Sequence, residues 1–178
     1  MNKPRIASVF CLALALLAAS LPAVPQTAGR YTIEFVLFRN DADHSGEDGS
    51  ATASLRSTET DLSVAATPAA SRRLGTAASK LRSAGGYRIL AHTSWTQAPA
   101  AWNSRRGVPV AALGLSVPGL SGNVIFERGQ LLHLGFDLKY QEGDRTLQFA
   151  EIRKVKLEES QYFDHPQLGI IALVTASK

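Results

Sequence analysis

The sequence contains a single cysteine, and this scarcity excludes several kinds of chemistry. Cys11 lies in the middle of an apolar run near the N-terminus of the 178-residue chain. A lipobox would need this cysteine directly after the apolar run, so we do not expect lipidation. The rest of the chain has no cysteine, and it can neither form a disulfide nor use a thiol nucleophile. Its fold must therefore be stabilised by packing alone.

The sequence also lacks the motifs of metal sites and of common enzymes. The histidines are far apart, and no two have the H-x-H or H-x-x-x-H spacing of a metal site. There is no G-x-S-x-G nucleophile elbow and no phosphate-binding G-x-x-x-x-G-K-[ST] loop. The adjacent carboxylates Glu158 and Glu159 would point to opposite faces of a strand. We therefore predict no catalytic residue, no metal and no cofactor, and the protein is not expected to be an enzyme.

An excess of charge is absent as well. Removing Lys3 and Arg5 with the N-terminal segment leaves 17 of the 19 basic residues against 15 acidic ones. This near balance does not provide the basic surface that nucleic acid requires. Nucleic acid is therefore not an expected partner.

The N-terminal segment has the pattern of a secretory signal peptide. Lys3 and Arg5 precede an apolar run at residues 6–19, and small residues follow. The run is shorter than the roughly 20 residues that span a membrane. A cut after the small residues at 18–20 and a cut just before Arg30 both fit, so the mature chain starts between Leu21 and Arg30. We predict a signal peptide at 1–29 and one exported, periplasmic domain at 30–178 without a membrane anchor.

Hydrophobic periodicity predicts a strand, a helix and a second strand in the first half of the domain. Residues 31–38 are apolar on both faces, which is typical of a central strand. Residues 39–67 are acidic and aperiodic and form a predicted mobile insertion. Thr67 and Pro68 are expected to start a helix over residues 68–84, which Gly85 and Gly86 end. Residues 87–97 alternate as a second strand.

The second half of the domain is predicted to be a β-meander. Strands are expected at residues 123–127, 131–141, 146–158 and 168–175, with a short strand at 110–115. The alternation slips within 146–158, which a bulge near Ala150 and Glu151 would explain. Together the elements predict the α+β class: an antiparallel sheet with a helix packed on one face.

Candidate binding residues lie in a loop and a turn. Trp95 and Tyr140 fit core packing, whereas Trp102, beside Arg105 and Arg106 in the loop at 98–109, is the better candidate for an exposed aromatic ring. An exposed indole can stack on a sugar ring. The two arginines could meet an acidic glycan or an acidic protein patch, or they could be merely solvated.

The turn that contains Tyr162, Asp164 and His165 has two readings. Asp164 can hydrogen-bond nearby backbone amides, and Pro166 favours an extended backbone at His165. The turn is therefore either purely structural or a surface that presents Tyr162 and His165 to a partner. No nucleophile accompanies the Asp-His pair, which argues against a catalytic dyad.

Four stretches in this order resemble the CsiV family of periplasmic peptidoglycan-binding proteins of Gram-negative bacteria. They are IEFVLFR at 33–39, YRILAHTSWTQ at 87–97, LLHLGFDLKY at 131–140 and YFDHPQLGI at 162–170. The resemblance implies a non-enzymatic role in the cell wall and in cell shape. It implies peptidoglycan as a partner, together with a penicillin-binding-protein synthase and its outer-membrane lipoprotein activator. It supplies no binding residues.

Two other function classes remain open at the level of the sequence. One is an enzyme that acts on the glycan or peptide of the wall. The other is a periplasmic module that binds a small ligand or responds to envelope stress. The missing catalytic motifs count against the first, and the sequence neither supports nor excludes the second.

Overall fold

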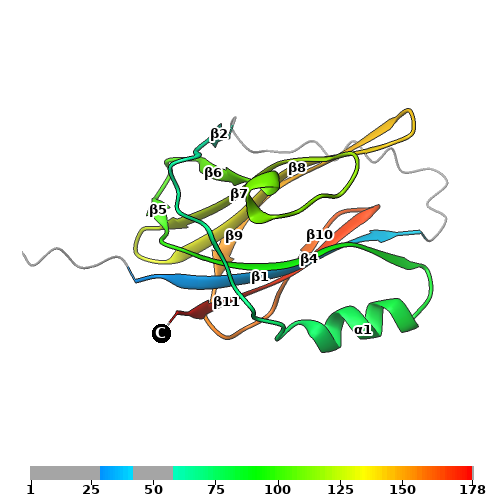
Figure 1. Ribbon diagram of the computed structural model, residues 1–178, viewed down its shortest axis with the longest axis horizontal. Helices are drawn as coiled ribbons and strands as arrows, with labels where there is room; N and C mark the ends of the chain where they lie inside the picture. Colours follow the sequence, from blue (N-terminus) through cyan, green and yellow to red (C-terminus); the bar gives the residue numbers. More distant parts are fainter. Residues whose placement is uncertain (1–28, 42–57, 178) are drawn as a thin grey trace, which may run out of the picture.

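Two β-sheets pack face to face in this protein, and a single helix covers part of one outer surface (Figure 1). The computed structural model describes residues 29–41 and 58–177. Residues 1–28 of the predicted signal peptide and residues 42–57 of the predicted insertion lie outside the described residues. The described ends of that insertion include the end of strand β1 and strands β2 and β3.

Five strands form the first sheet. Their order across the sheet is β10 (Gln161–Asp164), β11 (Leu168–Ala176), β1 (Tyr31–Asn40), β4 (Tyr87–Gln97) and β3 (Thr67–Pro68). All neighbours in this sheet are antiparallel. The helix α1 (Gly75–Ser83) lies on its outer face, where Leu74 and Ala78 pack against Val36 and Leu173.

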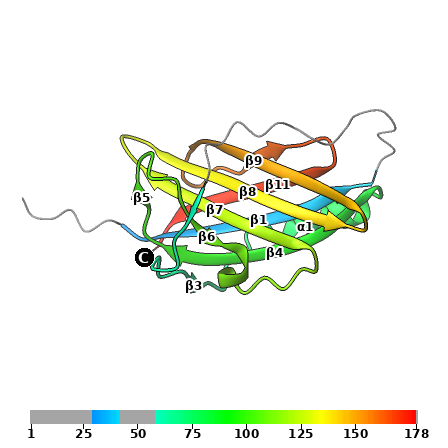
Figure 2. The same ribbon diagram turned by 90° about the horizontal axis from the view of Figure 1, so that it is seen from above.

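The second sheet contains the meander. Its order is β2 (Glu59–Thr60), β6 (Arg106–Pro109), β7 (Leu120–Arg128), β8 (Leu132–Glu142) and β9 (Arg145–Val155). Strand β5 (Ala100–Ala101) also pairs with β7, and a short 3-10 helix (Val110–Leu113) follows β6. Figure 2 shows the meander strands lying across the strands of the first sheet.

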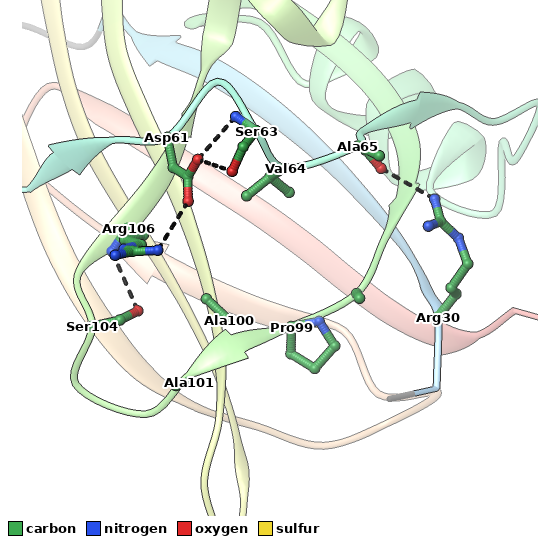
Figure 3. A pocket seen from close by; sticks show the side chains of 11 residues that line it. Arg30, Asp61, Ser63, Val64, Ala65, Pro99, Ala100, Ala101, Ser104 and Arg106 are labelled. Carbon is green, nitrogen blue, oxygen red and sulfur yellow. Dashed lines mark hydrogen bonds and ion pairs between the residues drawn. The ribbon is translucent and has the colours of Figure 1, made fainter. Parts of the chain in front are cut away.

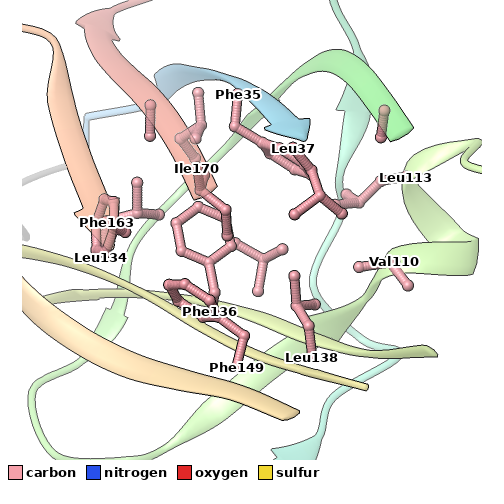
Figure 4. Packing of buried hydrophobic residues seen from close by; sticks show 14 of the residues in the cluster. Phe35, Leu37, Val110, Leu113, Leu134, Phe136, Leu138, Phe149, Phe163 and Ile170 are labelled. Carbon is pink, nitrogen blue, oxygen red and sulfur yellow. The ribbon is translucent and has the colours of Figure 1, made fainter. Parts of the chain in front are cut away.

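Aromatic and aliphatic side chains fill the space between the sheets (Figure 4). Phe35 of β1 meets Trp95 and Phe136 edge to face, with ring centroids 5.8 and 5.3 Å apart. Phe136 in turn meets Phe163 at 5.0 Å. Such edge-to-face pairs add to the hydrophobic gain of burial. The prediction that Trp95 and Tyr140 pack in the core is confirmed, since both are buried.

The α+β class and the helix packed on one face of a sheet are confirmed, as is the central position of β1. The strands nevertheless form two sheets where the sequence suggested one. The alternation in β8 correctly identified Leu134, Phe136 and Leu138 as its buried side. Alternation shows which side of a strand is apolar, but it does not show whether the covering layer is a helix or a second sheet.

Two local predictions are wrong, the first because pairing with a distant strand decides the structure and the second because a tight local turn does. Thr67 and Pro68 pair with β4 as strand β3, and α1 begins only at Gly75. Residues 110–113 form a 3-10 helix and no strand.

The bulge predicted near Ala150 and Glu151 is also wrong. The register between β8 and β9 runs without interruption from Glu142–Arg145 to Leu132–Val155. Glu151 and Arg153 share the parity of the buried Leu147 and Phe149, but β9 is an edge strand and the two residues form an ion pair with each other there. There Arg153 Nη1 donates to the carbonyl of Tyr162 at 2.8 Å and links the edges of the two sheets. The ion pair with Glu151 and the hydrogen bond to Tyr162 satisfy the polar groups of Arg153, so β9 can remain a regular strand where its apolar pattern stops.

A buried carboxylate fixes the chain that leads into the helix. Glu34 of β1 accepts hydrogen bonds from the backbone amides of Arg73 and Leu74 at 2.9 and 3.0 Å. It also accepts one from Ser71 Oγ at 2.8 Å, and His92 Nε2 lies 2.7 Å from its other oxygen. Burial by itself would raise the pKa of Glu34, but these hydrogen bonds outweigh burial and lower it.

We predict that Glu34→Gln destabilises the fold by about 2 kcal/mol or more at neutral pH, since an amide cannot accept all of these hydrogen bonds. The folded pKa lies below the unfolded one, so the stabilisation is complete above the unfolded value of about 4.3. It is lost as pH falls through the folded pKa. Urea unfolding of the parent and the variant between neutral and acidic pH measures this difference. Exposed Glu159→Gln is the control, and a pH-independent gap would contradict the assignment.

Candidate functional site

The structure separates the six predicted binding residues into two groups. Trp102, Arg105 and Arg106 belong to the loop between β5 and β6 and to the start of β6, beside the second sheet. Tyr162 and Asp164 lie on β10 at the edge of the first sheet, and His165 follows in the turn to β11. The two groups are therefore described as separate candidate surfaces.

Trp102 is an exposed aromatic ring on a supported loop. Its side chain is about half exposed, and its ring lies 4.0 Å from the His133 ring, centroid to centroid. The guanidinium carbon of Arg105 is 5.5 Å from the indole centroid, within the range of a cation–π contact. Gly129 packs closely against Trp102: a Cβ atom added at Gly129 would lie 3.1 Å from the Cβ atom of Trp102, which is too close for easy packing. The indole is therefore held in place while part of it faces solvent.

A buried carboxylate shapes this loop. Glu127 at the end of β7 is fully buried and accepts hydrogen bonds from the backbone amides of Asn103 and Arg105 at 3.0 and 2.5 Å. Ser104 Oγ donates to it at 3.3 Å, and Arg105 Nη1 lies 3.5 Å from it. Asn103 and Arg105 both have a positive φ, of 63° and 55°, which is unfavourable for residues other than glycine. The bonds to Glu127 offset this cost.

Sequence reasoning missed Glu127, His133 and Gly129 as parts of this site. Glu127 ends an otherwise apolar strand segment from Val124 to Phe126. A charged residue in such a position is a signal of burial with partners, although the sequence does not show which loop supplies them.

A pocket of about 350 Å³ lies beside the loop (Figure 3). Asp61 lies in it, 3.7 Å from Arg106, and accepts hydrogen bonds from the hydroxyl and backbone amide of Ser63 at 2.5 and 2.9 Å. These bonds, and to a lesser extent Arg106, lower the pKa of Asp61. The remaining lining residues are Arg30, Val64, Ala65, residues 98–101 and Ser104.

The pocket and the indole offer complementary chemistry. Arg30 and Arg106 place two guanidinium groups at the pocket, and guanidinium groups bind carboxylates well. The exposed indole offers a flat apolar surface of the kind that sugar rings stack on. Ala101 and Ser104 line the pocket and flank the exposed tryptophan in the chain. A ligand with both sugar rings and carboxylates would use both features.

His165 has the contacts of a structural turn residue. It is buried, and its Nδ1 accepts hydrogen bonds from the backbone amides of Gln167 and Leu168 at 3.1 and 3.2 Å. Its ring also packs near Phe149, with centroids 5.8 Å apart. These contacts agree with the structural reading of the turn.

Within residues 29–41 and 58–177, no three His, Cys, Asp or Glu side chains are grouped so that they could hold a metal ion. In the same part of the chain, no helix has the length and apolar character needed to cross a membrane.

We predict that Glu127→Gln loosens the Trp102 loop. The amide would turn a donor toward backbone amides that need an acceptor, at a cost of about 1–3 kcal/mol in unfolding free energy. The only other tryptophan, Trp95, is buried, so acrylamide quenching of fluorescence reports mainly on Trp102. Quenching is expected to increase in Glu127→Gln and to stay unchanged in the exposed control Glu59→Gln. Equal quenching in all three proteins would contradict the role of Glu127.

Comparison with known proteins provides one match. The model of a family described as "Peptidoglycan-binding protein, CsiV" matches residues 47–176, which include the helix and every strand except β1. No curated protein and no solved structure is similar enough to the chain to match it. The family match covers most of the chain and agrees with the resemblance found in the sequence. This protein therefore belongs to the CsiV family, whose description is peptidoglycan binding.

Proposed function

We propose that this protein binds peptidoglycan through Trp102 and the adjacent pocket, and that it acts in the periplasm without catalysing a reaction. The observation that carries this proposal is the exposed indole, which the buried carboxylate of Glu127 and the ring of His133 hold in a defined position. A ring that is already fixed loses little conformational entropy when it binds. The membership of the chain in a family described as peptidoglycan-binding supports the choice of ligand.

The chemistry of the site fits the chemistry of the wall. Peptidoglycan combines amino sugars with peptide stems that carry carboxylates. The indole of Trp102 stacks on a sugar ring, while Arg106 and Arg30 face the carboxylates of a stem. The hydroxyl of Ser63 can bond sugar hydroxyls or amides.

The carboxylates of the site support a binding role over a hydrolytic one. A glycan hydrolase needs a carboxylic acid whose pKa is raised, so that it can donate a proton at neutral pH. The pKa of Asp61 is lowered instead. Glu127 is fully buried and committed to the loop backbone. Neither group has the environment of a general acid.

The proposal extends to the role of the protein in the cell. In this role it is exported by the signal peptide at 1–29, stays in the periplasm of a Gram-negative cell, and supports wall synthesis as an adaptor. Its partners are a penicillin-binding-protein synthase and the outer-membrane lipoprotein that activates it. The sequence resemblance and the basic and apolar N-terminal segment support this extension.

We predict that the mature protein sediments with purified, protein-free sacculi and that Trp102→Ala lowers the bound fraction at moderate salt. The loss of a central aromatic contact is expected to weaken binding about tenfold or more. Leu157→Ala removes an exposed apolar side chain elsewhere and is the matched control. Equal sedimentation of the parent and Trp102→Ala would move the site away from this loop, and no sedimentation at any salt would rule out direct binding.

Two further readouts of the same samples test the remaining parts of the proposal. The incubated sacculi are expected to release no soluble fragments, and their release would indicate an enzyme. Arg106→Ala is expected to weaken binding mainly at low salt, because the guanidinium of Arg106 is exposed and salt screens its attraction to carboxylates.

A further inference from the structure

Two exposed tyrosine rings pack against a buried phenylalanine on the outer face of the first sheet. Phe38 of β1 lies between Tyr87 of β4 and Tyr162 of β10, with ring centroids 5.6 and 6.3 Å from its own. The rings of Phe38 and Tyr162 are parallel to within 10°. Phe38 is buried, whereas Tyr87 is 39% and Tyr162 49% exposed. We call these three residues the tyrosine platform.

The backbone and a carboxylate hold the platform in position. A side chain at Gly169 would collide with Phe38, since an added Cβ would lie about 2.3 Å from its ring. Glycine at this position of β11 thus allows the Phe38 ring to lie across the strand. The hydroxyl of Tyr162 donates to Asp164 Oδ1 at 2.8 Å. Burial and then Asp164 raise the pKa of Tyr162 to about 12, so its hydroxyl stays neutral at physiological pH.

The tyrosine platform is separate from the Trp102 site. Tyr87 pairs with Asn40 at the C-terminal end of β1. The Trp102 loop lies near the opposite end, where Ala101 pairs with Arg128 and Arg128 Nη1 donates to the hydroxyl of Tyr31 at 3.1 Å. Figures 1 and 2 both show β5 at one end of the sandwich and the start of β4 at the other. One ligand ring cannot touch both.

The arginines that follow Phe38 and Tyr87 in the sequence point to the opposite face of the first sheet, where they pair with acidic residues. Arg39 Nη2 lies 3.0 Å from Glu142, and Arg88 Nη2 lies 2.5 Å from the same carboxylate. Asp41 is 3.7 Å from each of these two arginines. The ionisable group that borders the platform is therefore the Asp164 carboxylate, which accepts hydrogen bonds, and this suits a neutral ligand that carries hydroxyl groups. The Tyr87 ring is nearly perpendicular to the Phe38 ring, at 85°, so the two tyrosines present differently oriented rings. Exposed tyrosine rings beside a carboxylate match sugar rings, which have apolar C–H faces and donate through their hydroxyls.

We infer that the tyrosine platform is a second sugar-binding site, which takes the neutral face of a β-linked N-acetylhexosamine chain. One molecule then holds two glycan strands, one at each end of the sandwich. This inference rests on the proposed function, because it assumes that the Trp102 site holds the first strand.

A bridging experiment tests the inference. Sacculi are loaded with the protein, washed and mixed with fluorescent oligomers of N-acetylglucosamine, and the fluorescence of the pellet is measured. The parent is expected to capture the oligomers. The double variant Tyr87→Ala/Tyr162→Ala is expected to sediment with sacculi as the parent does but to capture at least about tenfold less oligomer. Tyr162→Phe keeps the ring and is expected to retain most of the capture.

The outcomes separate this inference from the proposed function. Loss of sedimentation in Trp102→Ala reports on the first site, and loss of capture in the tyrosine double variant reports on the second. Both tyrosines are partly exposed, so the double variant is expected to fold, and its unfolding midpoint is compared with that of Leu157→Ala. Capture by the double variant equal to that of the parent would overturn the sugar assignment and leave the platform to a protein partner. No capture by the parent would overturn it as well.

Discussion

Burial of β1 on both of its faces is the constraint on which the rest of the structure depends. Phe35 enters the space between the sheets and meets Trp95 and Phe136, so the second sheet packs against this strand. Val36 on the opposite face supports the helix, and Phe38 supports the two tyrosines of the platform. A strand with two apolar faces must be covered on both sides. The tyrosine platform is a consequence of this double covering.

Two buried carboxylates, Glu34 and Glu127, each accept hydrogen bonds from the backbone amides of an irregular segment. Glu34 accepts backbone amides from the segment that leads into α1, and Glu127 accepts them from the Trp102 loop. In each case an irregular segment has amide groups that no strand or helix partner satisfies, and a carboxylate from a neighbouring strand satisfies them. The first carboxylate fixes the helix on its sheet. The second gives the exposed indole a defined position, which a binding site needs.

The sequence was informative where one residue pattern determines the structure. Strand β4 has the predicted bounds of 87–97, and the alternation of β8 correctly identified its buried side. The pattern failed where contacts between distant residues decide. Thr67 and Pro68 form β3 because they pair with the edge of β4. Glu151 and Arg153 fit a regular strand because Arg153 binds the carbonyl of Tyr162. The exposure of Trp102 could be predicted from its position in a loop. The roles of Glu127 and Phe38 could not, because they depend on contacts with residues that are distant in the sequence.

Hydrogen exchange of the protein with and without sacculi tests directly whether peptidoglycan binds at the Trp102 loop. Binding at this loop predicts slower exchange of backbone amides in the peptide that covers residues 98–106 when sacculi are present. It also predicts little change in the helix α1 (Gly75–Ser83), which faces away from the second sheet. Unchanged exchange at 98–106, with protection elsewhere in a protein that still sediments, would mean that peptidoglycan binds at another surface.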